Sequence, residues 1–106
     1  MNRTTFIELL EKRDFKTLKN TLEIMNAVDI ALLLSNLEDK ERAFAFRLIT
    51  KDKAADVFSN MSNPIQSYLV KIFTEKELRE LLDNLYMDDT VDLLEELPAN
   101  LVTRIL

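Results

Sequence analysis

Cysteine, histidine, glycine and tryptophan are all missing from this chain of 106 residues, and there are only two prolines. Without cysteine and histidine the chain can have no disulfide, thiolate nucleophile, imidazole base or Cys/His zinc site. Without glycine it has no glycine-rich phosphate loop, and the turns of a β-rich fold would lack their usual residues. Paired carboxylates exist, but nothing supplies a nucleophile or a cofactor loop, so we do not expect an enzyme.

Long apolar segments are also missing. The apolar runs are short and interrupted by charges, so none could span a bilayer, and the first residues show no signal-peptide pattern. Apolar residues still make up 47% of the chain, enough for a packed core, and its leucine, glutamate, lysine and alanine favour helices. We expect one all-α domain over residues 1–106, with no direct insertion of this segment into a membrane.

The charge of −5 is unevenly distributed. Residues 1–53 carry ten basic and nine acidic side chains, a net of +1, whereas residues 54–106 carry four and ten, a net of −6. Because phosphates require lysine and arginine, the C-terminal half is a poor nucleic-acid surface, and we expect no nucleic-acid partner. An acidic face suits a cation or a basic partner, but it can equally be an ordinary solvated face.

Apolar residues recur every 24 positions, and their offsets of three and four residues mark one face of a helix in each unit, here named helix A. Its columns are Phe6, Ile30, Ala54, Leu78, Val102; Leu9, Leu33, Val57, Leu81, Ile105; and Leu10, Leu34, Phe58, Leu82, Leu106. A second helix, helix B, follows from the columns Leu22, Phe46, Val70, Leu94 and Met25, Ile49, Phe73, Leu97. Within helix A we expect burial of Leu33, Leu34, Val57, Phe58, Leu81 and Leu82.

Helix-starting residues repeat with the same period. Each helix A is preceded by a member of the column Asn2, Asn26, Thr50, Thr74 and Pro98. Asparagine and threonine cap helix N-termini by accepting bonds from free amides, and proline suits the start of a helix. Before helix B we expect caps at Asp39 and Asn63, with Met87 as a weaker third member. Arg42 and Arg47, with Glu38 and Glu41, are interpreted as solvated helix faces.

Units of 24 residues leave about ten residues per helix, which is marginal for an isolated helix, so stability must come from stacking. The sequence therefore predicts a superhelical solenoid of short helix pairs. The chain ends within a fifth helix A with the apolar residues Val102, Ile105 and Leu106, whereas an isolated solenoid normally closes with a polar cap. We therefore expect this chain to be a fragment of a longer protein.

Two segments carry a resemblance to a known family. Residues 53–58 are Lys-Ala-Ala-Asp-Val-Phe, and residues 88–98 are Asp-Asp-Thr-Val-Asp-Leu-Leu-Glu-Glu-Leu-Pro. Together they make the stretch from Val28 to Leu106 resemble the intracellular N-terminal domain of the MgtE family of magnesium channels. The N-terminal helices extend the resemblance over nearly the whole chain.

The resemblance implies a cytoplasmic superhelix that is followed by a pair of cystathionine-β-synthase-type domains and a membrane pore, none of which lies in this sequence. It implies magnesium ions between this domain and the adjoining cystathionine-β-synthase-type domain when the channel is shut, and a homodimeric full-length protein. Carried over by position, the ligands would be Asp56, Asp88 and Asp92, with Asp89 as a further member of the motif. Magnesium would act as a weak regulatory ion.

The charge pattern is compatible with this ligand set and with a plainer alternative. Asp88 and Asp92 are four residues apart on one helix face, where like charges repel by a few tenths of a kcal/mol, and a divalent cation would relieve that repulsion. Magnesium keeps waters and needs few carboxylates. In the plainer alternative, Asp88 and Asp89 occupy a first helical turn because negative charge favours the helix dipole there.

The competing function is a protein-interaction scaffold related to the middle domain of the flagellar motor switch protein. That family would be expected to show a Glu-His-Pro-Gln stretch, and this chain has no histidine. The sequence therefore favours the magnesium-sensing regulatory domain of a transport protein over the scaffold.

Overall fold

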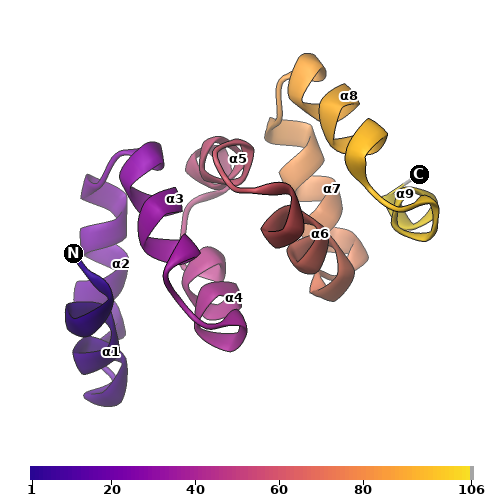
Figure 1. Cartoon of the computed structure of the whole chain (residues 1–106). Helices are drawn as coiled ribbons and strands as arrows, with labels where there is room; N and C mark the ends of the chain where they lie inside the picture. Colours follow the sequence, from indigo (N-terminus) through magenta and orange to yellow (C-terminus); the bar gives the residue numbers. More distant parts are fainter. Residues whose placement is uncertain (106) are drawn as a thin grey trace.

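In the computed structural model, which describes residues 1–105 and the side chains of residues 1–104, the chain forms short α-helices and no strand (Figure 1). The helices of this part are α1 (Arg3–Glu11), α2 (Phe15–Ile24), α3 (Ala27–Ser35), α4 (Asp39–Arg47), α5 (Lys51–Ser59), α6 (Asn63–Ile72), α7 (Glu75–Asn84), α8 (Met87–Glu96) and α9 (Ala99–Ile105). Odd-numbered helices are the predicted helices A and even-numbered ones the helices B, so the predicted all-α fold is confirmed.

The predicted caps of helices A are found at the expected positions. Asn2 and Asn26 accept hydrogen bonds at their side chains from the amides of Thr5 (2.9 Å) and Asp29 (2.8 Å). Thr50 is the N-cap of α5, and Thr74 forms a reciprocal capping box with the third residue of α7. Helix α9 begins at Ala99, directly after Pro98.

The predicted caps of helices B were wrong by one residue. The N-caps form the column Asp14, Glu38, Ser62 and Tyr86, so Asp39, Asn63 and Met87 are each the first helical residue instead. In α4 the reason is a capping box, because Glu38 and Glu41 satisfy each other's backbone amides. The prediction chose the residue types that most often cap helices and missed the reciprocal pair.

Both rows of helices contribute to one core, along which the helices A pack in order. Helix α5 packs between α3 and α7, and α7 also packs against α9. The predicted core residues are buried, except that Leu82 is only half-buried: the buried ones are Leu33, Leu34, Val57, Phe58 and Leu81. Leu82 lies near the C-terminal end of the described stack, where fewer following units cover it. The predictions for the side chains of Ile105 and Leu106 fall outside the described side chains.

The stacked pairs form an elongated body with α1 and α2 at one end and α8 and α9 at the other (Figure 1). Its extents are 39 × 22 × 21 Å. The repeat predicted from the sequence is thus a helical solenoid in space.

None of the described helices has the length and apolar character that crossing a membrane requires.

Arg42 is not on a solvated face, and its interpretation from the sequence was wrong. The residue is 7% exposed, and its guanidinium donates to the backbone carbonyls of Leu34 (2.8 Å) and Leu37 (2.7 Å) and to Asp39 Oδ1 (2.8 Å). One unit later, Gln66 Nε2 donates to the carbonyl of Phe58 (2.8 Å). In these two units a polar side chain of helix B therefore caps the C-terminal end of the preceding helix A.

Candidate acidic site on helices α5 and α8

Helix α8 presents most of the predicted site. Its first turn contains Asp88 and Asp89, where negative charge interacts favourably with the helix dipole. The helix fully buries only Leu93. Asp88 and Asp92 are exposed and four residues apart, on the same side of the helix. The structure therefore places these two carboxylates where an outside ligand can reach them.

Asp89 contacts helix α5 directly. Ser59 Oγ lies 3.2 Å from Asp89 Oδ2, within donating distance, and 3.1 Å from the backbone carbonyl of Ala55. This contact joins the end of α5 to the first turn of α8. Asp89, which the sequence added only as a further member of the motif, is thus the predicted carboxylate that bridges the two helices.

A hollow of about 160 Å³ lies beside this contact, between α8 and the link from α5 to α6. Asp89, Asp92 and Glu96 line its acidic side, and Asn63 and Gln66 add amide groups from α6. Asp88 does not belong to this lining. Glu96 was missed by the sequence analysis, although its position four residues after Asp92 was a usable signal.

Asp56 is the most separate of the four predicted residues. It is exposed on α5, one turn before Ser59, and its backbone carbonyl accepts a hydrogen bond from Asn60 Nδ2 (2.8 Å). Its side chain does not line the hollow. The two helices that carry the predicted ligands meet near Asp56, but the carboxylate of Asp56 is not brought together with those of Asp89 and Asp92.

Among the described residues, no basic side chain forms an ion pair with the carboxylates of α8 or with Asp56. The ion pairs of this part of the chain involve other residues. No three acidic side chains in the described part of the chain are grouped closely enough to hold a metal ion between them. Oxygen ligands for a hard cation are thus available on α8, while a full coordination shell would need water or another domain. Metal binding at Asp56, Asp88, Asp89 and Asp92 stays a prediction.

Comparison with protein families identifies the domain. The model of the MgtE intracellular N domain matches residues 25–106. The chain belongs to this family. No curated protein matched the chain in a separate search. The match to the MgtE N domain begins at the end of α2 and covers α3 to α9, including both segments on which the resemblance was based.

Membership of the MgtE family makes this chain an intracellular domain of a magnesium transporter, a transport family and not an enzyme family. The first unit, α1 and α2, precedes the matched residues. It still follows the 24-residue period and buries Phe6, Leu18 and Leu22 in the common core. The repeat in this MgtE N domain therefore extends one unit beyond the part that the family model covers.

Proposed function

We propose that this chain is the magnesium-sensing regulatory domain of its transporter, on the cytoplasmic side of the cell membrane. Magnesium binds weakly to the carboxylates of α8 and α5 and favours the closed state of the channel. The observation that carries the proposal is the set of exposed carboxylates on α8, Asp88 and Asp92, which have no basic partner among the described residues.

In this proposal, ions bridge the acidic surface to acidic groups on an adjoining cystathionine-β-synthase-type domain of the same protein. Without ions the facing carboxylates repel, and the assembly opens. An ion shifts this equilibrium only by its differential affinity for the two states. Several weak ions that each favour the closed form can together supply the ~5.5 kcal/mol that moves a population from one extreme to the other. The full-length protein acts as a homodimer.

The affinity of the isolated domain is expected to be low. Carboxylates on an open helix surface lack the oxygen cage of tight sites, so dissociation constants on the order of millimolar or weaker are expected. In a titration with magnesium chloride, backbone amides near Asp88, Asp92 and Asp56 should shift first and saturate. Saturable shifts centred on residues 1–30 would place the ion elsewhere and contradict the proposed site.

A second candidate function is a protein-interaction scaffold related to the flagellar motor switch middle domain. The observation in its favour is a set of exposed apolar side chains beside the carboxylates, namely Tyr86 at the N-cap of α8 and Met87 and Val91 within the helix. Such side chains suit a protein partner as well as an adjoining domain. The two candidates differ in their dependence on magnesium, because a scaffold surface would bind its partner equally well with and without the ion.

The deciding experiment is magnesium uptake by the full-length transporter across a series of magnesium concentrations. The double variant Asp88→Ala/Asp92→Ala removes two bridging ligands, so inhibition at high magnesium should weaken and the channel should stay active. The fold should persist, because an exposed first-turn aspartate contributes at most about 1 kcal/mol through the dipole. A control variant, Glu75→Ala/Asp83→Ala, removes two exposed carboxylates from α7 and should leave inhibition unchanged. Normal inhibition in a folded Asp88/Asp92 variant would refute the proposal.

A further inference from the structure

The C-terminal end of α2 is capped by a lysine from a helix two units further along. Lys53 of α5 donates from Nζ to the backbone carbonyls of Leu22 (3.3 Å) and Met25 (2.8 Å), and also to that of Glu23. The last carbonyls of a helix have no partner within the helix and carry the negative end of its dipole, so a cation is favourable there.

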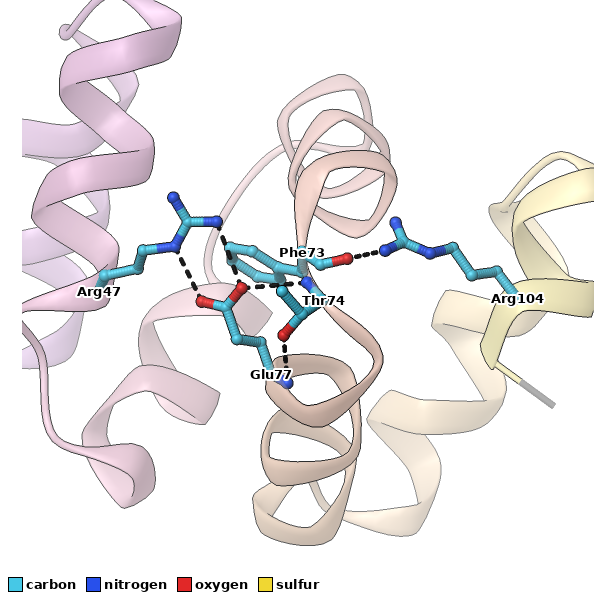
Figure 2. Close-up of polar contacts among 5 residues, drawn as sticks. All are labelled: Arg47, Phe73, Thr74, Glu77 and Arg104. Carbon is cyan, nitrogen blue, oxygen red and sulfur yellow. Dashed lines mark hydrogen bonds and ion pairs between the residues drawn. The ribbon is translucent and has the colours of Figure 1, made fainter.

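The same arrangement returns at the end of α6. Arg104 of α9 donates to the carbonyls of Val70 (2.7 Å), Lys71 and Phe73, and Figure 2 shows its guanidinium at the Phe73 carbonyl. These three carbonyls lie 48 residues, or two repeats, after those that Lys53 caps. In both places a helix A therefore supplies a basic side chain to the helix B of the unit two places earlier.

The intervening unit departs from this arrangement. The equivalent carbonyls belong to Phe46, Arg47 and Ile49 at the end of α4, and the helix that should cap them is α7. In α7, Glu77 stands 24 residues after Lys53, and Glu80 stands 24 residues before Arg104. Among the described side chains, none donates a hydrogen bond to these three carbonyls. The two positions that supply the basic caps in the sister units are thus acidic in α7.

The end of α4 also has a different backbone. Leu48 and Ile49 donate to the carbonyls three residues earlier, those of Ala45 (3.1 Å) and Phe46 (3.2 Å). At the ends of α2 and α6 the corresponding residues, Met25 and Phe73, donate to carbonyls four residues earlier. This tightening pairs the carbonyls of Ala45 and Phe46 with backbone amides. Among the described residues, the carbonyls of Arg47 and Ile49 receive no hydrogen bond.

A hollow of about 340 Å³ lies between the end of α4 and α7, and both Ile49 and Glu80 line it. Its walls are apolar side chains from four helices and their ends, namely Phe46, Ile49, Ala54, Phe73 and Leu81. Two ion pairs also line it. Arg47 donates to both carboxylate oxygens of Glu77 (2.8 and 3.2 Å; Figure 2), and Lys51 pairs with Glu80 (3.0 Å). Arg47 also lies 5.8 Å from the centre of the Phe73 ring.

We propose that this hollow binds the basic side chain, arginine or lysine, of a protein partner. The aliphatic stem would lie against Phe46, Ile49 and Phe73, as long basic side chains do on apolar surfaces. The charged head would lie between the carboxylate of Glu80 and the carbonyls of Arg47 and Ile49, which correspond to carbonyls that Lys53 and Arg104 cap in the sister units. In the Lys51–Glu80 pair the lysine is exposed and the glutamate is half-buried, so the pair is weak enough to be replaced.

A magnesium ion fits this hollow less well than a basic side chain does. Magnesium needs an octahedral shell of oxygens, whereas these walls are largely apolar and their two carboxylates, Glu77 and Glu80, come from one helix. The site is separate from the acidic surface of α8, so its failure would leave the proposed magnesium-sensing function untouched.

The first test is an amide-shift titration of the whole chain at low ionic strength with N-acetyl-arginine methylamide. Weak but saturable shifts are expected at residues 46–51 and 77–81. N-acetyl-citrulline methylamide has nearly the same size without the charge and should produce no saturable shift there. Absence of saturable shifts with the arginine probe, or equal shifts with magnesium chloride at matched ionic strength, would overturn the proposal.

Three variants sharpen this test. Glu80→Arg places a basic residue in the column of Arg104, so it should fill the hollow from within and abolish the probe shifts. Asp83→Arg makes the same charge change on α7 away from the hollow and should leave the shifts intact. Glu80→Gln keeps the hollow open without the charge and should weaken binding a few-fold, which covers the case in which Glu80→Arg does not fold. Shifts that persist unchanged in both Glu80 variants would overturn the proposal.

Discussion

Helices α5 and α8 both contribute predicted ligands, yet they are embedded in opposite ways. Helix α5 packs between α3 and α7 and buries Ala54, Ala55, Val57 and Phe58. Helix α8 fully buries only Leu93 and leaves apolar and acidic side chains exposed together. The 24-residue pattern produces a fixed core helix where units stack on both sides. At the edge of the described stack, the same pattern leaves a surface that another molecule can cover.

The largest test of this contrast is truncation of one apolar side chain on each helix. Phe58→Ala on α5 removes a ring that is 1% exposed, and it should lower the free energy of unfolding by about 3–5 kcal/mol. Met87→Ala on α8 removes a side chain that is 81% exposed, and its effect should stay within roughly 0.5 kcal/mol. Urea denaturation of both variants measures the difference. Equal costs would show that α8 is packed as firmly as α5.

A smaller effect is expected from the buried cap between α3 and α4. Arg42→Met removes the donor to the carbonyls of Leu34 and Leu37. The Leu34 carbonyl keeps its bond from the Leu37 amide (3.2 Å), but the buried Leu37 carbonyl is left unsatisfied, at a cost of about 1–3 kcal/mol. Arg42→Gln introduces the side chain that caps α5 from the same column and should recover part of this loss. The control is Arg79→Met on the exposed face of α7. A cost no larger than that of the control would show that the cap is unimportant.

The smallest effect concerns the half-exposed Arg47–Glu77 pair. The hydrogen bond from Arg47 holds the pKa of the Glu77 carboxyl below its usual range, and the same bond raises the pKa of Arg47. A lowered carboxyl pKa stabilises the fold above the unfolded-state pKa of about 4.3, and this stability is lost as pH falls through the folded-state value. Glu77→Gln keeps a residue suited to the capping box but should cost no more than about 1 kcal/mol at neutral pH.

Thermal melts of the chain and of Glu77→Gln, across pH and salt, test this expectation. The difference in Tm should be present at pH 7 and low ionic strength. It should shrink in ~1 M salt, where the Debye length is about 3 Å, and should vanish at acidic pH, once Glu77 is protonated in both states. A difference that is independent of pH would assign the effect to packing and not to the ion pair.

The sequence predicted the fold well because the repeat is local and periodic. Helix positions and the caps Asn2, Asn26 and Thr74 depend on neighbours within one turn, which the sequence lists directly. The caps of helices B were displaced by one residue because Asp39 and Asn63 are favourable cap types beside less obvious ones. In each case two adjacent residues could serve as the N-cap, and the structure uses the earlier one.

The polar contacts between units could not be predicted in the same way. Burial of Arg42 depends on the carbonyls that surround it. The one hint in the sequence was that Gln66, one repeat later, is also a side chain that can donate hydrogen bonds. For the candidate site, the sequence selected the correct helices but could not show that Asp89 contacts Ser59. It also could not show that Asp56 lies apart. Side-chain directions at the α5–α8 contact arise from stacking, which a one-dimensional pattern does not contain.

The caps provided by Lys53 and Arg104 have a consequence for how the domain melts. In a linear array of repeats, stability is ordinarily a sum of each unit and its contacts with the next. Here Lys53 ties the third unit to the first, Arg104 ties the fifth to the third, and the Arg47–Glu77 pair ties the fourth to the second. The coupling therefore reaches second neighbours, and fraying of one terminal unit removes support two units inward. We therefore expect such an array to unfold more cooperatively than one held together by contacts between adjacent units alone.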